Sequence, residues 1–106
     1  CEYAIKHGTL TSLSEQQLVD CAKSTYNCDG CNGGDTMGAF KYVHTEGGLC
    51  TESEYSYDAR DGSCKASSCG TKHTQNTGEK YLSKDSATSL MDGVAEGCVA
   101  VYIEAD

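Results

Sequence analysis

The residues with the widest chemical potential in this sequence are its cysteines and histidines. The 106-residue chain holds eight cysteines and three histidines. An imidazole can activate a thiolate for attack on a carbonyl carbon, both groups can bind zinc, and two thiols can form a disulfide. Hydrolysis of an amide would also need a group that orients the imidazole and donors that stabilise the oxyanion. The spacing of these residues decides which chemistry is open to the chain.

The three histidines are poorly placed to act as catalytic bases. The pattern predicts His7 near the end of a helix, His44 on the face of another helix, and His73 in a polar, strand-like stretch. A structural role is the simpler interpretation for each of them. The sequence therefore predicts no catalytic residue among these 106 residues.

A zinc site is the strongest rival use of the cysteines. Cys28 and Cys31 form a C-x-x-C pair, which can bind zinc or act as a redox pair. The other ligands of a tetrahedral zinc would come from Cys64, Cys69 and His73. Against this reading, the second half of the chain lacks a short C-x-x-C or H-x-x-x-H spacing. Four further cysteines would also have no role.

Composition narrows the class of protein. The net charge of -8, from 16 acidic and 8 basic residues, would repel phosphate, so we expect no nucleic-acid partner. No apolar run is long enough to cross a membrane, so we expect no membrane partner either. Eight cysteines in so short a chain indicate an oxidising compartment. A secreted, disulfide-rich binding or inhibitor module would share these properties and is a second alternative.

Boundary signals predict four helices. The first covers residues 2–7 and ends at Gly8. The second follows Ser14, whose hydroxyl accepts the amide of Gln17 while the Gln17 side chain reaches back, and it ends by Cys21. The third begins at residue 34 or 35 and ends at residues 47–48, and the fourth is capped by residue 85 or 86.

Apolar spacing predicts which faces of the later elements are buried. The third helix places one set of side chains on a single face, namely Met37, Phe40, Val43 and His44. The fourth helix does the same with Ala87, Leu90, Met91 and Val94. From Cys98, the alternation of Val99, Val101 and Ile103 predicts a strand. Residues 22–34 and 51–77 are predicted to be loops.

Two strings carry a family resemblance. The chain reads S-E-Q-Q-L-V-D-C at residues 14–21 and C-N-G-G at residues 31–34. Together they resemble the papain-like cysteine peptidases, which have an S-E-Q-x-L-V-D-C helix followed by C-x-G-G at the substrate cleft. Further matches are G-G-L at 47–49, E-Y-S-Y at 54–57, G-S-C-K at 62–65 and G-C-V-A-V at 97–101. Ser56 and Cys98 stand where relatives usually have proline, which leaves the chain without proline and adds an exposed thiol.

The resemblance implies an α+β, papain-like fold seen in part. Residues 1–70 correspond to the helical left domain, and residues 71–106 cross into the right-hand β-barrel domain. The parent would be an endopeptidase that hydrolyses peptide bonds through an acyl-thioester without a cofactor. Its partners would be protein or peptide substrates, protein inhibitors and a pro-segment, and its location secreted or lysosomal/vacuolar. The C-W-A-F-like and D-H-G-like catalytic segments of the family do not occur here, so the fragment alone is predicted to be inactive.

The resemblance also assigns the candidate substrate-binding residues. Gly33 and Gly34 would let an extended substrate pair its main chain with the enzyme, because no side chain intervenes. The other positions are Asp35 and Thr36 at the second and third subsites, Asp29 beside the third, and Tyr102 at the floor or side of the second. Relatives often have apolar residues at 35 and 36 and a small residue at 102, so we expect a narrower and more negative pocket.

The family resemblance also assigns disulfide partners to some of the cysteines. The resemblance implies bonds from Cys21 to Cys64 and from Cys50 to Cys69, and it gives Cys31 a partner upstream of this span. Each closed loop would stabilise the fold by roughly 3 kcal/mol on the chain-entropy estimate. The family nucleophile lies about three helical turns before the position of Glu2, so Cys1 is expected to be structural. The resemblance gives no partner for three cysteines, namely Cys1, Cys28 and Cys98.

Overall fold

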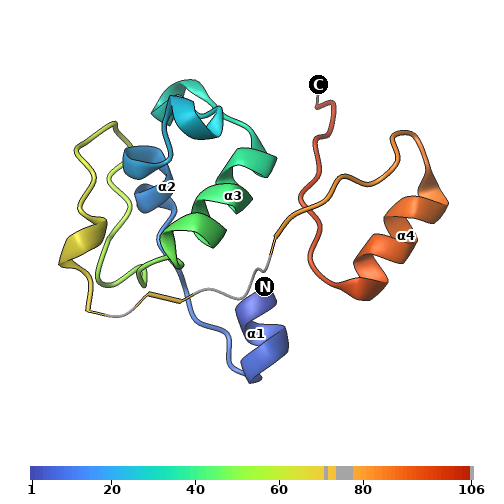
Figure 1. Cartoon of the computed structure of the whole chain (residues 1–106), viewed down its shortest axis with the longest axis horizontal. Helices are drawn as coiled ribbons and strands as arrows, with labels where there is room; N and C mark the ends of the chain where they lie inside the picture. Colours follow the sequence, from blue (N-terminus) through green and yellow to red (C-terminus); the bar gives the residue numbers. More distant parts are fainter. Residues whose placement is uncertain (71, 74–77, 106) are drawn as a thin grey trace.

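The computed structural model describes residues 1–70, 72–73 and 78–105 and is built from helices and loops (Figure 1). Its elements are α1 (Glu2–His7), α2 (Glu15–Cys21), η1 (Ser24–Tyr26), η2 (Gly30–Asn32), α3 (Thr36–Glu46), η3 (Ala66–Ser68) and α4 (Ala87–Glu96). No β-strand occurs among the described residues, and two isolated bridges join Leu13 to Thr51 and Leu49 to His73. The longest described helix has 11 residues, about half the length that a bilayer requires.

The four α-helices lie where the boundary signals predict them. Gly8 ends α1 in the left-handed conformation, with φ 73°, and Gly47 ends α3 in the same way, with φ 81°. Ser14 caps α2 by accepting the amide of Gln17 at 3.0 Å, and Ser86 caps α4 by accepting the amide of Ser89 at 3.1 Å. These predictions are confirmed. The sequence could make them because each signal acts within one helical turn.

The interior between α2 and the loops that follow it is largely polar. Four polar side chains are buried there, namely Ser14, Gln16, Gln17 and Asp20. Gln17 does not reach back to cap α2, as the sequence suggested. Its side chain instead donates to the Tyr42 hydroxyl at 3.0 Å and accepts the Cys50 amide at 2.7 Å. Gln17 thereby ties α2 to α3 and to the loop after α3.

Tyr55 and Asp20 form a second buried link between α2 and a distant loop. The Tyr55 hydroxyl donates to Asp20 Oδ2 at 2.6 Å and accepts the Lys65 amide at 3.0 Å. Burial and the Asp20 carboxylate raise the pKa of Tyr55 to about 12. Burial opposes ionisation of Asp20, but hydrogen bonds from Tyr55, Gln16 and the Gly62 backbone outweigh it and lower the Asp20 pKa.

The predicted buried face of α3 is only partly correct. Met37 is buried, but Tyr42 replaces His44 as the inward-facing residue of the second half of the helix. Tyr42 packs edge-on against Tyr26, with ring centroids 5.5 Å apart, and receives the Gln17 hydrogen bond. A large ring with a polar tip can be buried once its hydroxyl has a partner, so apolar spacing alone did not identify it.

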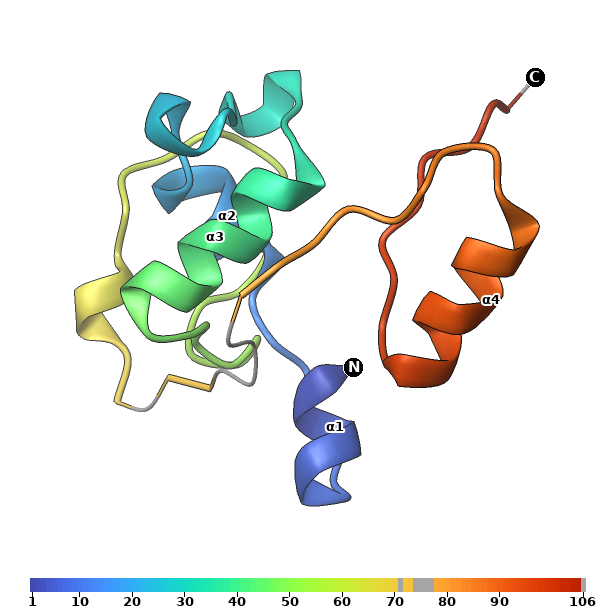
Figure 2. The ribbon, with the colours of Figure 1, turned by 45° about the vertical axis from the view of Figure 1, so that its right-hand side comes forward.

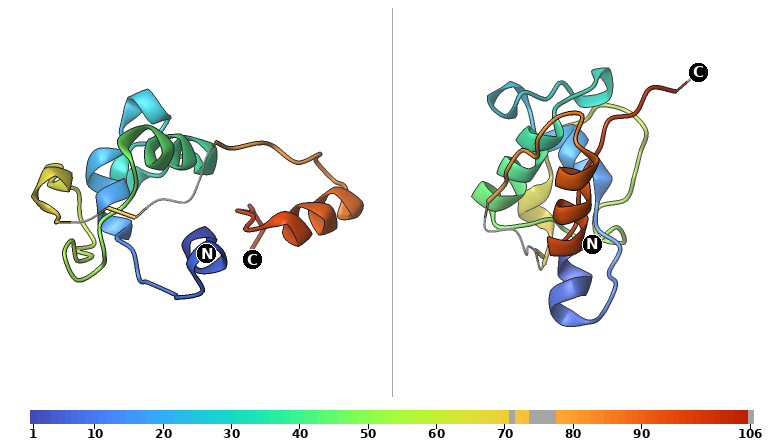
Figure 3. Two further views of the ribbon diagram at one scale, coloured as in Figure 1. Left: turned by 60° about the horizontal axis from the view of Figure 1, so that its bottom comes forward. Right: turned by 90° about the vertical axis from the view of Figure 1, so that its right-hand side faces the viewer.

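The C-terminal part departs most from the sequence prediction. α4 stands apart from α2 and α3, and α1 lies between them (Figures 2 and 3). The predicted apolar face of α4 is not covered in this chain, since Met91 is 71% and Val94 60% exposed. The predicted strand after Cys98 is wrong for the described residues, because a strand needs a hydrogen-bonded neighbour and no described segment pairs with residues 99–103.

Candidate functional site

The Gly33–Gly34 turn forms one wall of a hollow of about 510 Å³. Asp29 and Asp35 line the same hollow, so four of the six predicted substrate-binding residues meet there. Gly33 has φ 120°, a conformation that favours glycine, and the space where a side chain would begin is empty. A main chain lying along this turn could therefore approach the Gly33 backbone without obstruction.

The turn is held from behind by two sets of contacts. The Asp29 amide donates to the Gly33 carbonyl at 2.9 Å, and the Cys31 amide donates to Asp61 Oδ1 at 2.9 Å. A Cβ on Gly34 would lie 3.0 Å from Cys28 Sγ, so only the small residue fits without a shift of Cys28. The sequence drew attention to the glycines but not to Asp61, which accepts the Cys31 amide just before them from a loop 30 residues away.

Asp35, Thr36 and Tyr102 are brought together by hydrogen bonds at the start of α3. Asp35 caps this helix by accepting the Met37 amide at 3.2 Å. The Tyr102 hydroxyl accepts the Thr36 amide at 3.1 Å and donates to Asp35 Oδ1 at 3.5 Å. The Thr36 amide is one of the helix donors without an intrahelical partner, and Tyr102 supplies that partner from a segment 66 residues later.

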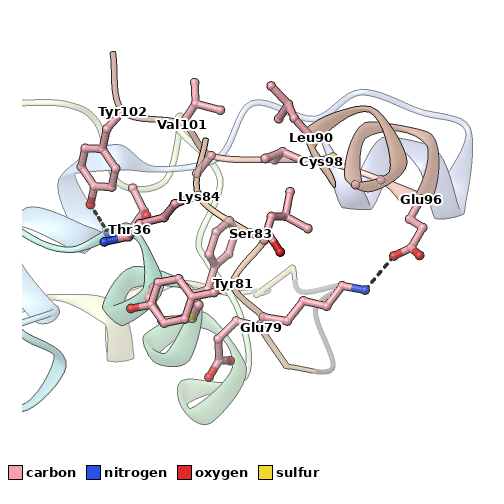
Figure 4. Close-up of a pocket in the computed structure, with 18 of the residues that line it drawn as sticks. Thr36, Glu79, Tyr81, Ser83, Lys84, Leu90, Glu96, Cys98, Val101 and Tyr102 are labelled. Carbon is pink, nitrogen blue, oxygen red and sulfur yellow. Dashed lines mark hydrogen bonds and ion pairs between the residues drawn. The ribbon is translucent and has the colours of Figure 1, made fainter. Parts of the chain in front are cut away.

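Tyr102 and Thr36 also line a larger cavity of about 840 Å³ (Figure 4). One side of this cavity is the start of α3, including Met37 and Phe40. The other side is formed by residues 78–87, by α4, and by residues 97–102. Figure 4 shows the Tyr102 ring pointing toward Thr36 at one end of the cavity. All six predicted residues thus border one of two hollows, and the neighbouring residues Asp35 and Thr36 line one hollow each.

The free thiols are not arranged as activated nucleophiles. Cys31 is exposed and unbonded, and partial desolvation and the nearby Asp61 carboxylate raise its pKa, which disfavours the thiolate. Cys28 is half-buried, and its Sγ donates to the Tyr26 carbonyl at 3.3 Å.

Two of the histidines pack against one tyrosine ring. The ring centroids of His7 and His73 lie 4.5 Å and 5.0 Å from the ring centroid of Tyr3.

Six cysteines are paired in disulfides. Cys21 is bonded to Cys64 and Cys50 to Cys69, the same pairs that the family resemblance implies. Cys64 and Cys69 are therefore not available to the hypothetical zinc site. Among the described residues, no three metal-ligating side chains of His, Cys, Asp or Glu come together.

The third disulfide was missed by sequence reasoning. Cys1 is bonded to Cys98, with Cα atoms 6.1 Å apart, so Cys98 is not the exposed thiol that the sequence suggested. The available signal was that Cys1, Cys28 and Cys98 had no assigned partner. With three unassigned cysteines and 97 residues between these two, spacing could not choose the pair.

Known proteins match over the whole described site. The profile of the papain family of cysteine proteases covers residues 1–106. Digestive cysteine proteinase 1 of Homarus americanus is 42% identical over 105 residues, which is 98% of this chain and 32% of that protein. The chain therefore spans about a third of that relative's length.

Two solved structures have a similar fold. The Carica candamarcensis cysteine protease CMS1MS2, in complex with E-64, has a TM-score of 0.78 at 29% identity over 87% of this chain and 41% of its own. The proform of the ragweed cysteine protease Amb a 11 has a TM-score of 0.78 at 33% identity over 87% of this chain and 27% of its own.

Proposed function

Because the chain belongs to the papain family of cysteine proteases, we propose that it forms one wall of the substrate cleft in a cysteine endopeptidase. The observation that carries this proposal is the contact between the Tyr102 hydroxyl and the Thr36 amide. It joins the start of α3 to a segment far along the chain, beside the open Gly33–Gly34 turn. A cleft between two parts of a protein is a common place for a substrate site.

The turn would hold the main chain of the substrate. The open face of Gly33 allows an extended peptide to come within hydrogen-bond distance, and Gly34 would donate to and accept from the residue two before the scissile bond. Asp35 and Thr36 would line the second and third subsites, Tyr102 would form the floor or side of the second, and Asp29 would flank the third. Tyr102 would narrow the second subsite and exclude large aromatic side chains.

The chemical step would use residues outside these 106. In the proposed reaction a thiolate attacks the scissile carbonyl carbon, and an imidazolium gives its proton to the leaving amine. The resulting acyl-thioester is then hydrolysed by water, which restores the thiol. The raised pKa of Cys31 and the disulfide at Cys1 argue against either residue as that nucleophile.

Domain organisation and partners follow the same proposal. Residues 1–70 would belong to the helical left domain and residues 71–106 to the crossing into the barrel domain. Because the Carica relative is bound to E-64 and the ragweed relative is a proform, we infer that inhibitors and a pro-segment are partner kinds here too. The three disulfides favour an oxidising location, either secreted or lysosomal/vacuolar.

A peptide-library profile of the complete protein tests the proposal. We expect hydrolysis, labelling by an epoxide inhibitor, and poor acceptance of Phe at the second subsite. Tyr102→Ala should raise the relative rate for Phe about ten- to a hundredfold, since burial of one side chain is worth about 1.5 to 3 kcal/mol. The matched control is Tyr57→Ala, because Tyr57 is also exposed and borders neither hollow.

Two results would contradict the proposal. An unchanged profile in Tyr102→Ala would place Tyr102 outside the cleft. Stoichiometric labelling of Cys1 by the epoxide in the 106-residue chain would show that the nucleophile lies within this span. A secreted binding module, the alternative function, would instead bind peptides without cleaving them in the complete protein.

A further inference from the structure

The Cys1–Cys98 disulfide joins the start of α1 to the segment that carries Tyr102. It connects residues that are 97 positions apart, and a hydrogen bond reinforces it: the Cys98 amide donates to Glu2 Oε1 at 2.8 Å. Gly97 fits closely in the same place, because a Cβ there would lie 2.6 Å from Glu2 Oε1. The chain after α4 is therefore fixed to α1 at Cys98 by a covalent bond, a hydrogen bond and close packing.

Tyr102 follows only four residues after this fixed point. Four residues of extended chain span at most about 14 Å, so the bond at Cys98 limits where the Tyr102 ring can lie. The ring itself is 72% exposed and is held by its hydroxyl at Thr36 and Asp35. The segment between the two residues has no strand neighbour among the described residues that could position it instead.

The bond is also open to attack from solvent. Cys1 is exposed and Cys98 half-buried, whereas Cys50 of the Cys50–Cys69 disulfide is fully buried and Cys69 half-buried. The Cys21–Cys64 disulfide, with Cys64 exposed and Cys21 half-buried, is similarly open, so the contrast in access is with Cys50–Cys69 alone. Thiol–disulfide exchange requires a thiolate to reach one sulfur along the S–S axis, so access controls its rate. A soluble thiol should therefore open the Cys1–Cys98 bond before the Cys50–Cys69 bond.

We propose that the Cys1–Cys98 disulfide is a thiol-sensitive tether that positions Tyr102 over Thr36. A dithiol reductant attacks the exposed Cys1 sulfur, the S–S bond breaks, and Cys98 leaves as a thiolate that takes up a proton. The second thiol of the reductant then displaces Cys1 from the mixed disulfide. Two electrons pass to the protein, which holds two thiols, and the reductant becomes a cyclic disulfide. Tyr102 is then released from the start of α3.

The consequence for catalysis rests on the proposed function, but the tether itself does not. If Tyr102 bounds the second subsite, reduction should widen that subsite in the complete enzyme. The tether can be measured in the full 106-residue chain without any catalytic activity. A failure of the tether and a failure of the protease proposal are thus distinguishable.

The first experiment is hydrogen exchange at individual amides of the chain and its variants. Cys1→Ser/Cys98→Ser removes the tether, and Tyr102→Phe removes only the hydroxyl that receives the Thr36 amide. We expect each change to accelerate exchange of the Thr36 amide about fivefold, the equivalent of one ordinary hydrogen bond. The combined variant should exchange no faster than either alone, because both changes break the same contact.

Two other amides separate positioning from general support. The Ser89 amide, which donates to Ser86 Oγ in α4, and the Gln17 amide, which donates to Ser14 Oγ in α2, should keep their protection. If the double-serine variant also loses protection at Gln17, the disulfide is a general staple and the proposal is overturned. Unchanged exchange at Thr36 overturns it as well.

The second experiment leaves the sequence unchanged. Partial reduction by dithiothreitol, followed by alkylation and peptide mapping, should label Cys1 and Cys98 while Cys50 and Cys69 remain joined. Thr36 exchange should accelerate in step with the labelling of Cys1 and Cys98, and not with that of Cys21 and Cys64, whose disulfide is similarly exposed. Opening of Cys50–Cys69 before or together with Cys1–Cys98, or acceleration that does not follow the labelling, would contradict a selective tether.

Discussion

Residues 12–69 and residues 78–105 of this chain are stabilised in different ways. In the first region, buried polar side chains on α2 fasten the surrounding loops, and two disulfides close it. In the second region, the large apolar side chains of α4 and the following segment are exposed, including Met91, Val94 and Ile103. The first region therefore contains most of its own stabilising contacts. The second is fixed by a few links to α1 and α3.

This difference would give the proposed substrate wall both rigid and adjustable parts. The Gly33–Gly34 turn belongs to the first region, and Asp61 fixes the chain just before it by accepting the Cys31 amide. Tyr102 belongs to the second region and contacts the first through one hydroxyl. We expect changes in the first region to alter the stability of the whole fold, and changes in the second to act locally.

The largest effect should come from Gln17→Leu. Gln17 is fully buried, and leucine of similar size would leave the Cys50 amide and the Tyr42 hydroxyl without partners. Each unpaired buried group costs about 1 to 3 kcal/mol, so we expect the free energy of unfolding to fall by about 2 to 6 kcal/mol. Urea unfolding followed by circular dichroism measures this loss. Thr88→Leu, at an exposed position of α4, is the control.

The second effect is removal of the Cys50–Cys69 disulfide. The bond closes 19 residues, and the chain-entropy estimate for a loop of that size is about 3 kcal/mol. Cys50→Ala/Cys69→Ala should lower the free energy of unfolding by about that amount. Cys28→Ser serves as the control, because Cys28 is a free thiol. A loss no greater than the control would mean that the surrounding hydrogen bonds already fix this loop.

The third effect is a dependence of stability on pH from the Asp20–Tyr55 pair. The Tyr55 pKa is raised to about 12, so its stabilising effect is complete below pH 10 and disappears as pH rises toward 12. The Asp20 pKa is lowered, so its effect is present above the ordinary carboxyl pKa and disappears as pH falls below it. One pKa unit corresponds to about 1.4 kcal/mol, which puts the alkaline loss at about 2 to 3 kcal/mol.

Tyr55→Phe tests this assignment. Phenylalanine at position 55 cannot ionise. Most of the decline in stability between pH 10 and 12 should therefore be absent from the variant. Tyr57→Phe should leave the decline in place, because Tyr57 is 57% exposed. Equal alkaline declines in wild type and Tyr55→Phe would assign the effect to other groups.

The comparison of the two regions also shows what sequence could predict. Helix ends at Gly8, Ser14, Gly47 and Ser86 were predicted because a cap acts on residues within one turn. The role of Gln17 was not, because its partners lie 25 to 33 residues away in sequence. The candidate site divides in the same way: a local glycine motif marked the turn, whereas Asp61 and the Cys1–Cys98 bond depend on distant contacts.

The predicted strand failed for a related reason. Alternation at Val99, Val101 and Ile103 describes side chains that would fit a pleated sheet, but it does not supply a neighbouring strand. Burial of the α4 face likewise needs a surface to cover it. Apolar pattern thus predicts what a segment can do when a partner is present, and the described residues neither cover Met91 and Val94 of α4 nor pair with residues 99–103.

The smallest effect should come from truncation of the exposed face of α4. Met91 is 71% exposed, and alanine is at least as good a helix former, so Met91→Ala should change the free energy of unfolding by less than about 0.5 kcal/mol. Met37→Ala, in the buried face of α3, is the matched comparison and should lose about 2 to 5 kcal/mol, since it leaves a cavity in the first region. Urea unfolding of both variants measures the contrast directly. A loss of more than about 2 kcal/mol for Met91→Ala would show that α4 is covered in solution, and the two regions would then share one kind of core.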